Sequence, residues 1–405
     1  MKFDIFCEIQ IAKPWPADHE RRIIQESIEQ ARVADAQGFE IWWQVEHHGS
    51  PEFSYSAAPD LLLGAIAHNT KRMHVGQAGS LAPFKINHPM KVAERAATLD
   101  ILSGGRYELG LARSGGKEWE TFGAEAKTTA AELKEAMYMI PQMWTQDKFS
   151  WNSDLLQIPE REVTPHPLQK PHPRLWQTAG SPESFRSAGE YGVGVLGTTL
   201  LSPVTTMKNL LDIYSEASAK CTKPAGQFFN RDKGIFTFVN VAESRKQCIE
   251  SGAAWSALWY VHMAPITFKV PRAVWYDAII EGLHPNTVHR STQKNQPVAL
   301  SAEDPTDLTI RPDDIPVIVL LKKLAQGHSV SKEEAHEVLE ELDSVIIGDP
   351  DACLKKFKKY EEIGTDRIMC LMQFGSIPHE AVMRSLRLTG EQLIPAFAKK
   401  QSAAQ

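Results

Sequence analysis

Short apolar segments alternate with longer amphipathic segments along most of this chain of 405 residues. Runs of β-branched and aromatic residues bounded by glycine or proline favour strands, whereas apolar residues recurring every three or four positions favour helices. These patterns predict eight strands, each followed by a helix. The predicted strands cover residues 2–9, 39–48, 73–80, 107–112, 175–179, 193–198, 234–242 and 367–374.

This alternation predicts the fold class. Short parallel strands joined by helices make right-handed crossovers, and eight such units close into a (β/α)8 barrel, the TIM barrel. We therefore expect residues 1–405 to form a single domain of this kind. Residues 149–173 are predicted to be a polar, proline-rich crossing between the fourth and fifth strands.

One segment breaks the alternation before the eighth strand. Residues 265–330 are rich in proline and polar residues and show no strand pattern, which predicts a long insertion made of loops. Long loops in compact domains are usually lids or binding loops. We therefore expect this segment to include a mobile lid over the site.

Composition and charge exclude some classes of binding partner. The net charge is -6, the sequence pI is about 6.2 and no basic run is present, which argues against nucleic acid and anionic membranes as partners. Neither a signal peptide nor a membrane-spanning run is visible. The scattered cysteines are typical of reduced thiols in a cytoplasmic protein, not of disulfides or a zinc site; they are Cys7, Cys221, Cys248, Cys353 and Cys370.

Ionisable side chains end the second predicted strand, at Glu46, His47 and His48. Successive strand residues face opposite sides, so Glu46 and His48 share one side, while His47 shares the other with Trp43. Two histidines on opposite faces are poorly placed to bind one metal ion. If Trp43 faces the barrel interior, His47 lies at the open mouth, where barrel enzymes carry their chemistry. A structural capping histidine is the alternative.

Two other strand ends could hold an anion. Arg113 follows the fourth strand among small residues, where its guanidinium is free to bind a phosphate. After the fifth strand, Gly180, Ser181 and Ser184 surround the start of a helix, where backbone N–H groups and the helix dipole favour an anion. Taken alone, Arg113 suits a surface ion pair and Ser181 an ordinary helix N-cap. Their shared place at one end of the barrel favours a phosphate site.

The third strand ends in unusually small residues, Gly76, Ala78, Gly79 and Ser80. Either a flat ring lying on this backbone or a helix packed closely from outside would explain them, and the sequence does not separate these two readings. The sequence contains no recognisable metal site, dinucleotide-binding glycine motif or hydrolase nucleophile elbow.

The order and spacing of several short segments resemble the bacterial luciferase-like flavin monooxygenase family over nearly the whole chain. The resembling segments lie at residues 1–3, 36–39, 45–48, 75–76, 88–89, 102–106, 110–113, 179–184 and 348–350. The insertion at 265–330 falls where the luciferase α chain carries its mobile active-site loop.

The resemblance implies an enzyme that receives reduced FMN from a separate flavin reductase. It reacts that flavin with O2 to a C4a-peroxide and so oxygenates a small organic substrate. It implies His47 as the catalytic residue, with Trp43 in the wall of the substrate pocket. Arg113 and the Gly180–Ser181 turn with Ser184 would bind the phosphate, although the family has Glu-Ser where this chain has Gly180 and Ser181. It also implies a non-proline cis peptide at Ala78–Gly79 and a homodimer or a dimer with a related chain.

Two alternatives remain. A coenzyme F420-dependent oxidoreductase of the same superfamily would transfer hydride without oxygen. A non-catalytic flavin-binding protein is the other, and the paired histidines disfavour it because storage of a flavin needs no proton donor.

Overall fold

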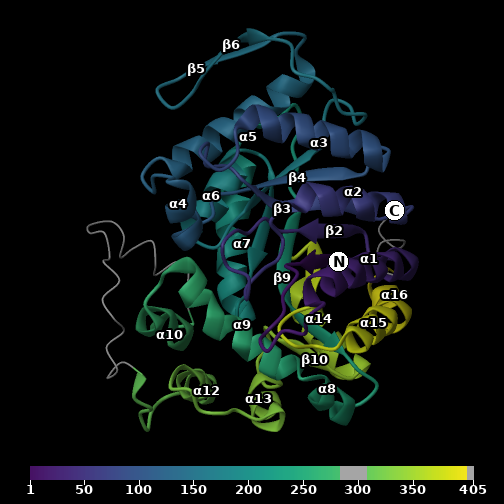
Figure 1. Cartoon of the computed structure of the whole chain (residues 1–405), viewed down its shortest axis with the longest axis vertical. Coiled ribbons are helices and arrows are strands. Elements are labelled where there is room, and N and C mark those ends of the chain that lie inside the picture. Colours follow the sequence, from purple (N-terminus) through teal and green to yellow (C-terminus); the bar gives the residue numbers. More distant parts are fainter. Residues whose placement is uncertain (283–307, 399–405) are drawn as a thin grey trace.

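A computed structural model describes residues 1–282 and 308–398, and its central feature is a closed barrel of eight parallel strands (Figure 1). Each strand pairs with its neighbour, β11 returns to pair with β1, and β8 pairs with β9. The predicted TIM barrel is therefore confirmed. Its strands are β1 (Lys2–Cys7), β2 (Ile41–Gln44), β3 (His74–Leu81), β4 (Tyr107–Ala112), β7 (Arg174–Thr178), β8 (Gly194–Thr198), β9 (Lys233–Val241) and β11 (Arg367–Leu371).

Helices connect these strands and lie around the outside of the barrel (Figure 1). No helix in the described part of the chain is long and apolar enough to cross a membrane. The helices before the insertion are α1 (His19–Gln37), α2 (Pro59–Asn69), α3 (Pro89–Ser103), α4 (Gly116–Phe122), α5 (Thr129–Thr145), α6 (Pro182–Glu190), α7 (Val204–Lys220), α8 (Arg245–Ser251) and α9 (Ala253–Phe268). Those around the last strand are α14 (Pro350–Glu362), α15 (His379–Leu388), the π-helix η2 (Thr389–Leu393) and α16 (Ile394–Ala398).

Local signals set the ends of several helices. Gly38 ends α1 with a φ of 91°, a left-handed conformation that glycine adopts without steric cost. His88 begins α3 by accepting a hydrogen bond from the backbone N–H of Met90 at 3.2 Å. Such signals act over a few residues, which is why these boundaries were predictable from the sequence.

Two predicted loops contain more structure than expected. The crossing at 149–173 holds an antiparallel hairpin of β5 (Phe149–Asn152) and β6 (Gln157–Arg161), which projects beyond the helices (Figure 1). The insertion contains α10 (Arg272–Ile280) and α12 (Pro316–Ala325) and leads into α13 (Lys332–Leu339) and β10 (Ile346–Gly348), so the prediction of loops alone was wrong there. Residues 283–307 lie outside the described part. The role of the insertion as a lid stays a prediction.

The second strand is shorter than predicted. Its ladder with β3 ends at Gln44, and residues 45–48 belong to no strand or helix. There the backbone N–H of His47 donates to the carbonyl of Ser56 at 3.0 Å instead of to a strand. Neighbouring strands, not the local sequence, therefore decide where β2 stops.

Charged and aromatic side chains fill the barrel interior near the amino ends of the strands. Arg367 in β11 donates two hydrogen bonds, of 2.8 and 3.0 Å, to the carboxylate of Asp4 in β1, and both residues are fully buried. The indole of Trp43 donates to the same carboxylate at 3.0 Å and packs edge-on against Trp176. Trp43 therefore lies inside the barrel, as its strand face predicts. Trp43 does not line the cavity at the carboxyl ends of the strands. Val45, two residues further along and on the same side of the chain, does line it.

The Asp4–Arg367 pair gives a stability prediction. Arg367→Ala would leave the carboxylate of Asp4 buried without its cation, so we expect a loss of about 3–5 kcal/mol in the free energy of unfolding. Urea denaturation followed by circular dichroism measures this loss. Arg245→Ala is the control, since Arg245 pairs with Glu340 at the surface and should shift the midpoint little. Equal shifts for both variants would contradict a structural role for the buried pair.

Candidate active site

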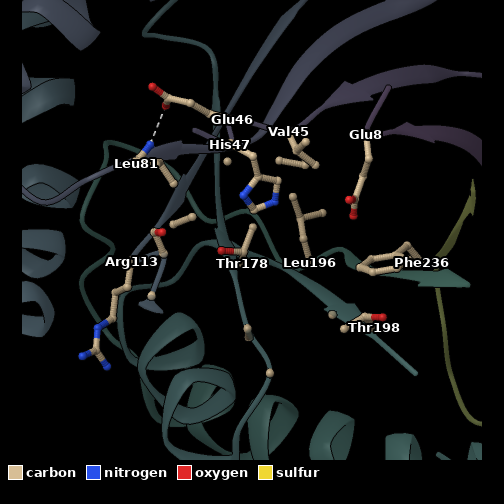
Figure 2. A pocket seen from close by; sticks show the side chains of 18 of the residues that line it. Glu8, Val45, Glu46, His47, Leu81, Arg113, Thr178, Leu196, Thr198 and Phe236 are labelled. Atoms are coloured by element: carbon tan, nitrogen blue, oxygen red, sulfur yellow. Dashed lines mark hydrogen bonds between the residues drawn. The ribbon is translucent and has the colours of Figure 1, made fainter. Parts of the chain in front are cut away.

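A cavity of about 220 Å³ opens at the carboxyl ends of the barrel strands. Figure 2 shows His47 near its middle, Arg113 on one side, and Glu8, Thr198 and Phe236 on the other. The barrel geometry produces this arrangement, because the ends of all parallel strands meet at one rim. The lining residues come from strands far apart in the sequence, including Glu8 after β1, His47 after β2, Ala78 in β3, Arg113 after β4, Thr178 in β7 and Thr198 in β8.

His47 is held by a carboxylate that comes from a different element. Its Nδ1 lies 3.1 Å from Oε1 of Glu118 in α4, and only 15% of the histidine side chain is exposed. The same oxygen of Glu118 accepts the backbone N–H of His48 at 2.7 Å, and the hydroxyl of Ser114 donates to its other oxygen. Glu118 therefore fixes the orientation of the imidazole.

This environment favours the protonated imidazole. Burial alone lowers the pKa of His47, but the charge and hydrogen bond of Glu118, together with the charges of Glu8 and Glu46, raise it from 6.5 to about 9. His47 thus carries a proton at neutral pH and can donate it within the cavity, as a general acid requires.

The other two residues of the motif face away from the centre of the cavity, as strand alternation predicts. His48 lies 3.3 Å from Glu46, which also accepts the side-chain amide of Asn87. Glu46 accepts the backbone N–H of Leu81 as well (Figure 2). Burial opposes ionisation of Glu46, yet these hydrogen bonds hold its pKa below the usual value. Glu46 and His48 therefore stabilise the segment that follows β2 through these hydrogen bonds.

Arg113 supplies a positive charge at one end of the cavity. Its Nε and one terminal nitrogen donate to the hydroxyl of Thr129 at 3.2 and 2.8 Å, and its guanidinium lies over the ring of Trp119. Within residues 1–282 and 308–398, no carboxylate forms an ion pair with it. The alternative of a surface ion pair is therefore not what the structure shows.

The turn before α6 is a well-formed helix cap. Ser181 and Ser184 form a capping box, and the hydroxyl of Ser184 accepts the backbone N–H groups of Gly180 and Ser181 at 3.1 and 3.0 Å. Gly180 and Ser184 line the cavity that Arg113 enters, whereas Ser181 lies buried outside its lining. The structure thus brings Arg113, Gly180 and Ser184, which were predicted to bind a phosphate, to the same cavity. The backbone N–H groups of Gly180 and Ser181 are already hydrogen bonded within the turn.

The small residues of β3 have separate explanations. A Cβ on Gly76 would lie 2.5 Å from the ring of Trp43, and one on Gly79 would lie 2.8 Å from the backbone of Gly110 in β4. Ala78 and Gly79 line the cavity, and the peptide between them is cis, as the family resemblance implied. Close packing inside the barrel, not a helix outside it, therefore accounts for both glycines.

Residues of the site that sequence reasoning missed include Glu8, Tyr260 and Phe268, which line the cavity, and Glu118, which holds His47. Glu8 had a usable signal, because it shares a strand face with Asp4 and Phe6 in an otherwise apolar segment. Glu118 had none, since it is 71 residues from His47 and in a short helix with no distinctive pattern. Among the described residues, no group of three or more His, Cys, Asp or Glu side chains could hold a metal ion.

Comparison with known proteins extends these findings. Residues 1–367 match the luciferase-like monooxygenase family. The oxygenase component of the flavin-dependent trigonelline monooxygenase of Acinetobacter baylyi is 30% identical over 223 residues, which are 54% of this chain and 60% of that protein. The chain therefore spans less than two thirds of that relative's length.

Solved structures share the fold at low sequence identity. Monooxygenase RslO1 from Streptomyces bottropensis has a TM-score of 0.71 at 20% identity, covering 98% of this chain and 100% of its own. The oxygenating constituent of 3,6-diketocamphane monooxygenase from Pseudomonas putida, solved with FMN, has a TM-score of 0.66 at 16% identity, covering 98% of both chains. Coenzyme F420-dependent enzymes share the fold too. Because the family match covers nearly the whole chain, the protein belongs to the luciferase-like monooxygenase family.

Proposed function

We propose that this protein is the oxygenase component of a two-component monooxygenase that uses reduced FMN and O2. The observation that carries the proposal is one cavity with two charged groups. The cation of Arg113 lies at its end and has no ion-pair partner in the described part of the chain, and the protonated His47, held by Glu118, lies in its middle. Reduced FMN, when bound, supplies the electrons by which one oxygen atom of O2 enters the substrate and the other leaves as water.

The donor set fits a flavin that ends in a phosphate. Arg113 offers a planar, charged group suited to a phosphate, and Ser184 adds a hydroxyl at the same end of the cavity. The amides of Gly180 and Ser181 already donate to Ser184, so further contacts from this turn require its internal hydrogen bonds to open. Arg113 therefore supplies the main contact with the phosphate.

His47 manages a proton beside the reacting centre. Because its Nδ1 is bonded to Glu118, its Nε2 is the nitrogen left to hold or release a proton toward a bound molecule. The aromatic rings of Phe53 and Phe268 pack edge-on against the imidazole and help to exclude water. A fixed proton donor in a largely apolar cavity suits oxygenation, which must avoid wasteful reaction with water.

A coenzyme F420-dependent oxidoreductase remains the second candidate, because enzymes of that type share the fold. Product analysis with isotopically labelled O2 separates the two activities. Label in the product supports the monooxygenase, whereas turnover that continues without O2 supports hydride transfer.

The proposal also includes protein partners. A separate reductase would supply the reduced FMN, which agrees with the name "oxygenase component" given to the relative from Acinetobacter baylyi. A dimer through helices beside β2 and β3 would cover exposed apolar side chains, since Leu61 in α2 is 78% exposed and Leu102 in α3 is 63% exposed.

Arg113→Ala should weaken binding of reduced FMN far more than binding of reduced riboflavin, which lacks the phosphate. A charge-assisted contact of this kind is worth roughly 1.5–3 kcal/mol, or about tenfold to a hundredfold in Kd. Anaerobic titration of both flavins measures the difference. Equal losses for the two flavins would place Arg113 outside the phosphate site.

His47→Ala should abolish most product formation while the fold and flavin binding persist. Loss of a general acid lowers turnover by about 10²–10⁴. Product assays and thermal melting of the same preparation test this expectation. His48→Ala is the matched control, because His48 braces Glu46 outside the centre of the cavity. An inactive His48→Ala beside an active His47→Ala would reverse the assignment.

Glu118→Gln should change the pH dependence of turnover. With Glu118 present, the raised pKa keeps His47 protonated from neutral pH up to about 9, so an acid-dependent rate falls as pH rises through that value. Removing the charge of Glu118 lowers this pKa and moves the fall to lower pH. The profile of kcat against pH measures the shift. Glu120→Gln, in the same helix but paired with Lys269, should leave the profile unchanged.

A further inference from the structure

The side of the cavity beyond His47 carries a carboxylate that the proposed reaction does not use. Glu8 follows β1, is 2% exposed and lines the cavity. Figure 2 places it on the opposite side of His47 from Arg113, near Phe236 and Thr198. We call Glu8, Phe6, Phe236, Thr198 and Tyr260 the Glu8 end of the cavity.

The partners of Glu8 are neutral. Its Oε1 accepts the hydroxyl of Tyr260 at 2.8 Å, and its Oε2 accepts the side-chain amide of Gln10 at 3.2 Å. Throughout the described residues, no lysine or arginine forms an ion pair with it. The positive charge of His47 acts on Glu8, but the imidazole is hydrogen bonded to Glu118. Each carboxylate oxygen can accept a second hydrogen bond, so Glu8 keeps acceptor capacity.

Aromatic rings line this end of the cavity. Phe6 and Phe236 stack with their centroids 4.1 Å apart and their planes 7° apart, and both line the cavity. Tyr260 lines it too and packs against Phe53 and Phe238. Aromatic faces attract cations, and a low dielectric strengthens a carboxylate's attraction for a positive charge.

A second polar residue, Thr198, lies at this end. Thr198 lines the cavity and is 8% exposed, but its hydroxyl oxygen is buried and has no hydrogen-bond partner among the residues that the structure describes. The side chain would have to rotate to turn that hydroxyl toward a bound molecule. Glu8 is therefore the group that marks this end of the cavity as a binding site.

From these contacts we infer that the Glu8 end binds a positively charged nitrogen, so that the substrate is an organic cation with a flat ring. The inference rests on the proposed function, because it names the substrate class of that same site. Burial raises the pKa of Glu8 to about 7 against the opposing charge of His47. A bound cation would hold the carboxylate in its ionised form, which a neutral ring cannot do.

The test compares N-methylquinolinium, a flat cation, with methylnaphthalene, a neutral molecule of the same shape. Equilibrium dialysis of the full chain with each probe, above pH 7, gives the two Kd values without turnover. We expect the cation to bind about tenfold or more tightly than the neutral probe. Equal Kd values for the wild-type protein would overturn the inference.

Glu8→Gln should abolish the preference for the cation while neutral binding changes little. The variant has the same shape, and its new amide N–H can donate to Oε1 of Gln10, which has no partner among the described residues. Glu216→Gln, which removes the same charge from an exposed pair with Lys220, is the control and should keep the preference. A Glu8→Gln variant that keeps the preference would refute the role of Glu8.

Tyr260→Phe keeps the inference testable if Glu8→Gln does not fold. The hydroxyl of Tyr260 donates to Glu8 and lowers the pKa of that carboxyl, so its removal should weaken binding of the cation at pH 7 while binding of the neutral probe changes little. A preference for the cation that is unchanged at pH 7 would count against the inference. Failure here is distinct from failure of the proposed function. If Arg113→Ala separates FMN from riboflavin but no cation preference exists, only the substrate class is wrong. If the preference for the cation exists but Arg113→Ala weakens binding of both flavins equally, the cation site is supported and the assignment of FMN is wrong.

Discussion

A buried ion pair joins the first and last strands of the barrel, and the geometry of the site depends on that closure. Asp4 in β1 and Arg367 in β11 are 363 residues apart in sequence, yet both are fully buried and doubly hydrogen bonded. Burying two charges is costly unless hydrogen bonds compensate for the lost water. Here the indole of Trp43 donates to Asp4 and the carboxylate of Glu40 accepts from Arg367, while the second terminal nitrogen of Arg367 has no hydrogen-bond partner among the described residues. With β1 and β11 held together, the eight strand ends form one rim.

Charges on that rim are separated along one cavity. Arg113 lies at one end, Glu8 near the other, and His47 between them with its proton stabilised by Glu118. Opposite charges held apart in an apolar cavity give a bound molecule a preferred orientation. Under the proposed function, the flavin phosphate goes to the Arg113 end and the substrate to the Glu8 end.

The differences between the sequence predictions and the structure have separate physical causes. Trp43 was assigned to the pocket wall because alternation gives the side of a strand that a residue faces, but not its height in the barrel. The hydroxyls of Ser181 and Ser184 form a capping box within their own turn, and the assignment of Ser181 to an anion site stays a prediction. The insertion was predicted as loops, because the apolar side of a helix such as α12 packs on α9 and α13, which local pattern does not reveal.

The sequence by itself determined the order of eight strands, the family, and the faces of Glu46, His47 and His48, and it offered Arg113 as a candidate for binding a phosphate. These follow from period-two alternation, strand and helix propensity, and short motifs, all of which act within a few residues. Only the tertiary structure decided that Glu118 raises the pKa of His47, that Tyr260 meets Glu8, and that Thr198 keeps an unpaired hydroxyl. Such contacts join residues tens to hundreds of positions apart, so they exist only once the barrel has closed.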